Sequence, residues 1–161
     1  MKNKQPLLNS KSKIEERKNR ILNLLEKYKE PLERDHWNLT LNWGTPPLEN
    51  AAAWVRSEWQ LQQMTITINP EVEKWDDPWW SEIAIIHEYI HSILAAFDKQ
   101  IENIIDSYVP EELQDIILQH LNTYEEKAVT DLARIIFNIQ GVRQMGPESL
   151  DSKSEEKRNT S

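Results

Sequence analysis

The sequence H-E-x-x-H at residues 87–91 constrains this chain more than any other feature. The run that contains it, residues 81–97, is rich in apolar residues that are compatible with a helix. Positions four apart share one face of a helix, so His87 and His91 could bind one metal ion from one side. Glu88 would then lie beside the metal, where it could hold and deprotonate a metal-bound water as a general base.

The same motif also occurs by chance in proteins that bind no metal, because it fixes only three positions. Two observations favour a metal here. The chain has only four histidines, and two of them have this spacing. Glu88 also lies among apolar residues, where an uncompensated charge would be costly. These apolar residues are Ile83, Ile86, Ile90, Ile93, Leu94 and Phe97. We therefore expect one Zn²⁺ per chain, with three protein ligands and one open position.

Length and composition limit the other possibilities. With 161 residues the chain is expected to form one domain at residues 13–143, between disordered tails at 1–12 and 144–161. A net charge of −8 argues against a nucleic-acid partner. The absence of cysteine excludes disulfides and thiolate ligands. No signal peptide or membrane-spanning run is visible, so a cytoplasmic location without a membrane partner is expected. The oligomeric state stays open.

The first half of the chain predicts a helix followed by three strands. Helical periodicity covers residues 13–33, and Pro31 should end or kink this helix. Alternating apolar and polar residues predict strands at residues 36–43 and 63–70. A further strand is expected at 52–57, although its alanines would also suit a helix. The second and third strands should form an antiparallel pair.

The second half predicts helices. Asp77 and Pro78 are typical of an N-cap and a first helical position. The motif helix should run to about Asp98, followed by a short helix or turn at 101–108. A long helix should start at Pro110 and be closed by Gly141. The predicted class is α+β: an N-terminal helix, a small three-stranded antiparallel sheet, the H-E-x-x-H helix and a C-terminal helix that carries glutamates.

The third metal ligand should come from that C-terminal helix. Glu125 and Glu126 precede an apolar stripe, and Thr130, one turn after Glu126, could accept a hydrogen bond from a ligand histidine and fix its tautomer. Glu125 is the alternative, because it points to the centre of the stripe. His120 is a further candidate, but an exposed helix histidine is the more ordinary interpretation. His36 has no supporting spacing and is expected to be structural.

With these elements in this order, the chain resembles the minimal gluzincin-type zinc metallopeptidases, which are zincin-like in fold. More narrowly, it resembles small phage and prophage proteins of metallopeptidase type. They carry a later Glu-Glu-x-x-Val-x-x-Leu-Ala helix, which stands here at residues 125–133. The resemblance covers about Trp37 to Ile139. It implies a peptide or protein substrate, zinc bound by His87 and His91, and Glu88 as general base and later proton donor.

The resemblance also bears on the third ligand. In gluzincins the ligand glutamate is often followed four residues later by an aspartate that supports a ligand histidine. This match favours Glu126, although Thr130 stands here in place of the aspartate.

Three functions therefore compete. The first is a zinc-dependent peptidase-like hydrolase of narrow substrate range. The second is a catalytically inactive, metal-binding protein with a structural or regulatory partner. The third is a helical interaction domain in which the motif is accidental. Zinc content separates the third from the others, and hydrolysis that is lost in Glu88→Gln separates the first from the second.

Overall fold

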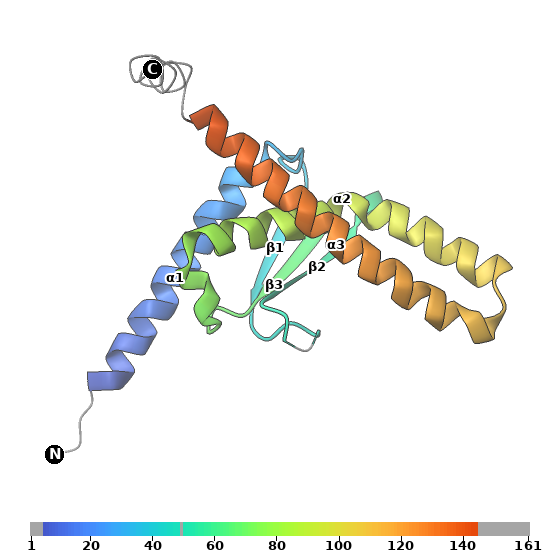
Figure 1. The fold of residues 1–161 in the computed structure, drawn as a ribbon. Helices are drawn as coiled ribbons and strands as arrows, with labels where there is room; N and C mark the ends of the chain where they lie inside the picture. Colours follow the sequence, from blue (N-terminus) through green and yellow to red (C-terminus); the bar gives the residue numbers. More distant parts are fainter. Residues whose placement is uncertain (1–4, 49, 145–161) are drawn as a thin grey trace, which may run out of the picture.

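Three α-helices and one three-stranded sheet form the part of the chain that the computed structural model describes, residues 5–48 and 50–144 (Figure 1). The helices are α1 (Gln5–Lys29), α2 (Pro78–Tyr108) and α3 (Glu111–Gln144). The strands are β1 (Asn38–Trp43), β2 (Ala53–Glu58) and β3 (Gln63–Ile68). The predicted α+β class is confirmed.

The sheet is mixed, so the prediction of an all-antiparallel sheet is wrong. Its order is β1-β3-β2, with β2 antiparallel to β3 as expected and β1 parallel to β3. The central place of β3 has a physical reason: its side chains Met64, Ile66 and Ile68 are all buried, so it gains most from neighbours on both sides. Alternation in the sequence predicts strands but not their order. As a consequence, β2 is an edge strand.

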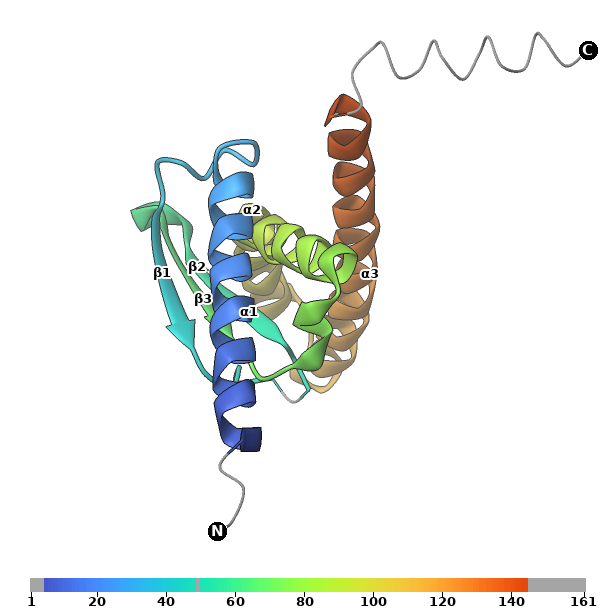
Figure 2. The same ribbon diagram turned by 90° about the vertical axis from the view of Figure 1, so that its left-hand side faces the viewer.

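One face of the sheet is covered by α1 and α2, and α3 lies on the side of α2 that faces away from the sheet (Figure 2). The core forms where these elements meet. Fully buried members come from every one of these elements: Ile21 and Tyr28 of α1, Ile66 and Ile68 of β3, Trp75 before α2, Ile85, Ile86 and Tyr89 of α2, and Val129 and Ala133 of α3. The motif helix is therefore fixed by packing on one side and is free to present its other side to β2 and α3.

The helix α1 begins at Gln5, eight residues before the predicted start at residue 13, and ends at Lys29, two residues before Pro31. Its buried Arg17 ties it to the segment before α2. The Nε and Nη2 atoms of Arg17 donate to Asp76 at 2.7 Å each, and Nη1 donates to the carbonyl oxygens of Pro70 and Glu71. Residues 1–4 of the predicted N-terminal tail lie outside the described residues.

The helix α2 begins as predicted. The side chain of Asp77 accepts hydrogen bonds from the backbone N–H groups of Trp79 and Trp80, and Pro78 occupies the first helical position. The predicted end near Asp98 is wrong, because α2 continues without a break to Tyr108. Polar residues after position 97 do not stop a helix, since only Pro and Gly interrupt it strongly.

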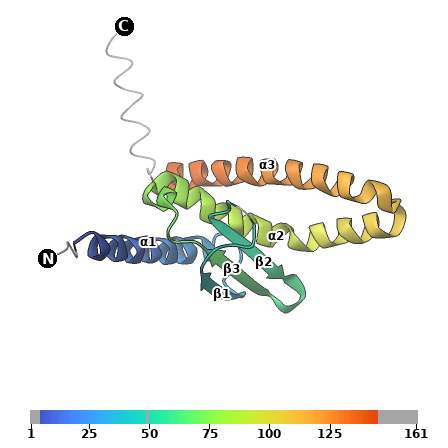
Figure 3. The same cartoon turned by 90° about the horizontal axis from the view of Figure 1, so that it is seen from below.

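The helix α3 begins at Glu111, directly after Pro110, and returns antiparallel to α2 (Figure 3). The prediction that Gly141 closes it is wrong, because α3 extends to Gln144. A helical Gly costs only about 1 kcal/mol relative to Ala, so it does not by itself end a helix. Residues 145–161 of the predicted C-terminal tail lie outside the described residues. Among the helices described, none has the length and apolar character needed to cross a bilayer.

Candidate metal centre

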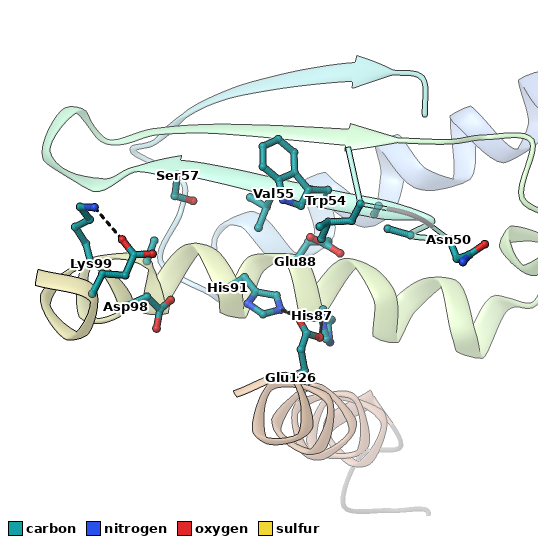
Figure 4. A pocket seen from close by; sticks show the side chains of 15 residues that line it. Asn50, Trp54, Val55, Ser57, His87, Glu88, His91, Asp98, Lys99 and Glu126 are labelled. Carbon is teal, nitrogen blue, oxygen red and sulfur yellow. Dashed lines mark hydrogen bonds and ion pairs between the residues drawn. The ribbon is translucent and has the colours of Figure 1, made fainter. Parts of the chain in front are cut away.

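The two motif histidines lie one above the other on α2 and point toward α3, where Glu126 meets them (Figure 4). The Nε2 atoms of His87 and His91 are 3.0 Å apart. One carboxylate oxygen of Glu126 lies 3.3 Å from Nε2 of His87, and the other lies 3.2 Å from Nε2 of His91. This group could hold a metal ion.

The three donor residues lie close enough together to hold one small cation. Zinc binds histidine nitrogen and carboxylate oxygen at about 2.0–2.2 Å, so two ligand atoms at tetrahedral positions lie about 3.3–3.5 Å apart. The two Nε2 atoms are 3.0 Å apart, and they lie 3.3 and 3.2 Å from two different oxygens of Glu126. One donor atom from each of the three residues lies within 4.8 Å of the other two. Two imidazoles and one carboxylate also form a common donor set of catalytic zinc sites. The residues present therefore fit the metal that the sequence predicts.

The outer nitrogens of the two histidines are held from α3. Nδ1 of His91 lies 2.9 Å from a carboxylate oxygen of Glu125. Nδ1 of His87 lies 3.5 Å from the hydroxyl of Thr130. A carboxylate on Nδ1 keeps the proton there and directs the lone pair of Nε2 toward the metal position. Glu126 thus lies at the Nε2 atoms of both histidines, and Glu125 lies at Nδ1 of His91. Thr130 supports His87, as the sequence predicts for one of the two histidines.

Glu88 lies one residue after the first histidine and is almost completely buried, with 8% of its surface exposed. Its carboxylate receives no hydrogen bond or ion pair from the residues that the structure describes. Burial raises the pKa of Glu88 to about 7, the charge of Glu126 acts in the same direction, and His87 and His91 oppose the shift. Such a group is costly to bury, which indicates that the fold keeps it for a purpose other than packing.

The pKa values of the ligand groups show how strongly these groups interact. Burial disfavours the charged form of His91, yet its hydrogen bond to Glu126 and the charges of Glu126, Glu88 and Glu125 raise its pKa to about 9. Hydrogen bonds from His87 and His91 hold the pKa of Glu126 well below its usual range. Without a metal ion, a proton on His91 therefore balances the carboxylates, and a metal ion that binds there must displace it.

An open cleft of about 570 Å³ runs past this group, between α2 and the free edge of β2. Figure 4 shows Trp54 and Val55 of β2 opposite Glu88, and Ser57 of the same strand near Asp98 and Lys99. A second hollow of about 280 Å³ lies at the other side of His87, where Trp79, Trp80 and Arg134 line it. An elongated molecule could therefore pass the metal position on both sides.

The other two histidines are not part of this centre. His120 lies on an exposed position of α3, and His36 is exposed beside Asp35, with 3.2 Å between its Nδ1 and the carboxylate.

The motif helix is less buried than its apolar sequence suggests. Ile83, Ile86 and Ile90 are buried as expected, whereas Ile93 and Phe97 are 43% and 62% exposed.

The sequence predicts Glu125 as the alternative metal ligand, but not its contact with Nδ1 of His91. Adjacent glutamates on one helix can reach the two nitrogens of one imidazole. Sequence reasoning missed Asp98. Asp98 was treated as the end of the motif helix, yet it lies in the cleft. Its position seven residues after His91, two helical turns along the same face, was a signal that could have identified it.

No protein-family model, curated protein or solved structure matches this chain. The resemblance to gluzincin-type peptidases, and the zincin-like architecture that it implies, stay predictions that rest on the motifs and on the geometry of the site.

Proposed function

We propose that this protein is a zinc-dependent peptidase that hydrolyses peptide bonds of a protein or peptide bound along β2. One observation carries the proposal. Two histidines and a glutamate that could hold a metal ion stand beside a buried carboxylate that has no partner among the described residues, and both line one open cleft. A structural metal site is usually closed by four protein ligands, whereas a catalytic site keeps a position open. Three ligands in a cleft favour catalysis.

His87, His91 and Glu126 would hold the metal, and Glu125 and Thr130 would orient the two imidazoles. When bound, zinc would supply a Lewis acid for the scissile carbonyl and lower the pKa of water. Glu88 accepts a proton from the attacking water while the oxygen of that water forms a bond to the carbonyl carbon of the substrate. The same carboxyl group then gives this proton to the amide nitrogen as the C–N bond breaks, so atoms and charge balance.

The decisive experiment compares zinc-loaded wild type with Glu88→Gln on a peptide library, with the cleaved products read by mass spectrometry. Glu88→Gln keeps the shape of the side chain but removes the base. We expect unchanged zinc content and a loss of rate of about 10²- to 10⁴-fold. Glu112→Gln, at an exposed position at the start of α3, is the matched control. Equal rates in wild type and Glu88→Gln would exclude this mechanism.

A second function is favoured by the exposed apolar side chains of the α2–α3 hairpin. Ile104, Tyr108, Leu113 and Ile116 are each about half or more exposed. Exposed apolar clusters often mark an interaction surface. A metal-binding protein that acts on a partner without hydrolysis would explain this surface. Zinc at one equivalent per chain, together with no cleavage of any peptide, would favour this alternative.

A further inference from the structure

The cleft continues along α2 well past the metal group. Beyond His91 it is lined by Ala95, Asp98 and Glu102, which follow each other at intervals of three or four residues and so share one helix face. The small side chain of Ala95 leaves room between His91 and Asp98. The opposite wall is the edge strand β2, whose outer backbone groups have no partner strand in the sheet.

Asp98 is the one carboxylate of this stretch that lacks a partner among the described residues. Lys99 pairs with Glu102, with 2.8 Å between Nζ and the carboxylate oxygen, and no described residue forms an ion pair with Asp98. The side chain of Asp98 is partly buried. Burial raises its pKa to about 6, the charges of Glu125 and Glu102 act in the same direction, and His91 opposes them. A cationic group would relieve this unfavourable environment.

Two other polar groups in the same cleft also have no hydrogen-bond partner within the described part of the chain. The carboxylate of Glu88 is nine-tenths buried and faces the cleft at the metal end. The hydroxyl of Ser57 is buried in the wall near Asp98, and no described residue hydrogen-bonds to it. Buried polar groups are normally paired in native proteins. Unpaired groups at both ends of one cleft therefore indicate that a polar ligand completes it.

We infer that Asp98 binds the lysine or arginine side chain of a peptide that lies along the free edge of β2. This inference rests on the proposed peptidase function and names its substrate class. An edge strand can accept a further strand through its backbone groups, and an alternating side chain of the added strand then points to the wall of the cleft. A carboxylate and a guanidinium or ammonium group form a charge-assisted hydrogen bond there.

The geometry also gives the position of the basic residue. His91 and Asp98 are seven residues apart on α2, or about 10 Å along the axis. An extended peptide advances about 3.3 Å per residue, so Asp98 lies about three residues from the bond at the metal. Along the cleft β2 runs in the same direction as α2, from Trp54 to Ser57 (Figure 4). Antiparallel pairing is the more stable arrangement, so we expect the peptide to run opposite to β2. The residues of the peptide near Asp98 are then on the N-terminal side of the bond at the metal.

The test measures binding in the Glu88→Gln background, where a bound peptide is not consumed. One set of labelled peptides carries a single lysine at successive positions of a neutral sequence, and a matched set carries norleucine instead. We expect the best lysine peptide to bind about tenfold more tightly than its norleucine partner, as a charged hydrogen bond permits. Adding Asp98→Asn should abolish the difference, and adding Asp98→Lys should favour glutamate peptides.

The control is Asp106→Asn, at an exposed position of α2 that does not line the cleft, and it should keep the preference. Equal binding of the two peptide sets, a preference that survives Asp98→Asn, or no binding of any peptide would overturn the inference. Cleavage by wild type is read separately. If the preference for lysine peptides is lost in Asp98→Asn but wild type cleaves no peptide, the peptidase function is rejected and the Asp98 subsite is kept. Cleavage without a preference for a basic residue two to four positions before the cleaved bond would reject the subsite and keep the peptidase.

Discussion

At the scale of single residues, two adjacent glutamates have different surroundings. Glu126 extends between the Nε2 atoms of both histidines and keeps 59% of its side chain exposed, as a ligand at the mouth of a cleft would. Glu125 has 25% of its side chain exposed and contacts the opposite nitrogen of His91. One residue along a helix turns a side chain by about 100°, which is why neighbours reach different sides of one imidazole.

Glu126→Ala should therefore weaken zinc binding more than Glu125→Ala does. Removal of Glu126 takes away one of three ligands, whereas removal of Glu125 takes away only the support of His91 and should cost about 10- to 100-fold in affinity. Competition with a fluorescent zinc chelator measures both values. A larger loss in Glu125→Ala would exchange the two roles, and no loss in either variant would place the third ligand elsewhere.

Asp98 should make stability depend on pH. Its pKa is about 6 in the folded protein and about 3.9 in an unfolded chain, so the folded state binds the proton more tightly. The free energy of unfolding should fall as the pH rises from about 4 to about 6, and this fall should be smaller in Asp98→Asn. Above pH 6 the variant should be more stable than wild type. Urea titrations of the metal-free proteins at several pH values test this, with Asp106→Asn as control.

At the scale of elements, α2 is fixed by contacts on the side opposite the metal group. Tyr89, one of the two variable residues of the motif, is fully buried and donates a hydrogen bond of 2.8 Å to the carbonyl oxygen of Leu25 in α1. Arg34 donates to the hydroxyl of Ser92 at 3.1 Å. These contacts determine which face of α2 is available for the cleft, because a helix anchored by one face presents the other.

Tyr89→Phe should lower the free energy of unfolding by about 1 kcal/mol, because it removes one buried hydrogen bond and keeps the ring. Urea denaturation measures the change. Tyr108→Phe is the matched control, since Tyr108 is 83% exposed at the end of α2 and should change stability by less than the error of the measurement. A similar decrease in the free energy of unfolding in both variants would show that the hydrogen bond between Tyr89 and Leu25 does not stabilise the fold.

At the scale of the whole molecule, the group of His87, His91 and Glu126, called the metal group, connects α2 to α3. Of the three residues that could hold a metal ion, two lie on α2 and the third, Glu126, lies on α3 near the buried Val129. Much of the rest of this hairpin is less buried: Ile104, Ile116 and Ile135 are each more than half exposed. A metal ion would therefore add a strong link between two helices whose apolar contacts are limited.

Zinc should raise the melting temperature of the wild-type protein, and a chelator should reverse the effect. A ligand that binds only the folded state stabilises it by about 4 kcal/mol when its concentration is a thousand times the Kd. His87→Ala and His91→Ala should show no such response at the same zinc concentration, whereas His120→Ala should respond as wild type does. Differential scanning fluorimetry provides the measurement. A zinc response that persists in both motif variants would show that the ion binds elsewhere.

The parts that could be predicted from the sequence are those set by local rules. The spacing of His87 and His91 on one helix face needs only the helical period, and the start of α2 needs only Asp77 and Pro78. The strands β1 and β3 follow from alternating side chains, and the antiparallel pair of β2 and β3 follows from their short connection. In each case the interacting residues are close in the chain, so the sequence itself contains the geometry.

Only the tertiary structure decided the rest, because it depends on residues far apart in the chain. The central place of β3 follows from how much apolar surface it buries against α1 and α2. The alternation of apolar and polar residues does not predict this place, because it is the same in an edge strand and in a central strand of a sheet. The different positions of Glu125 and Glu126 depend on how α3 crosses α2. The cleft that joins Asp98 to the metal group exists because β2 is the edge strand beside α2, a relation that only packing creates.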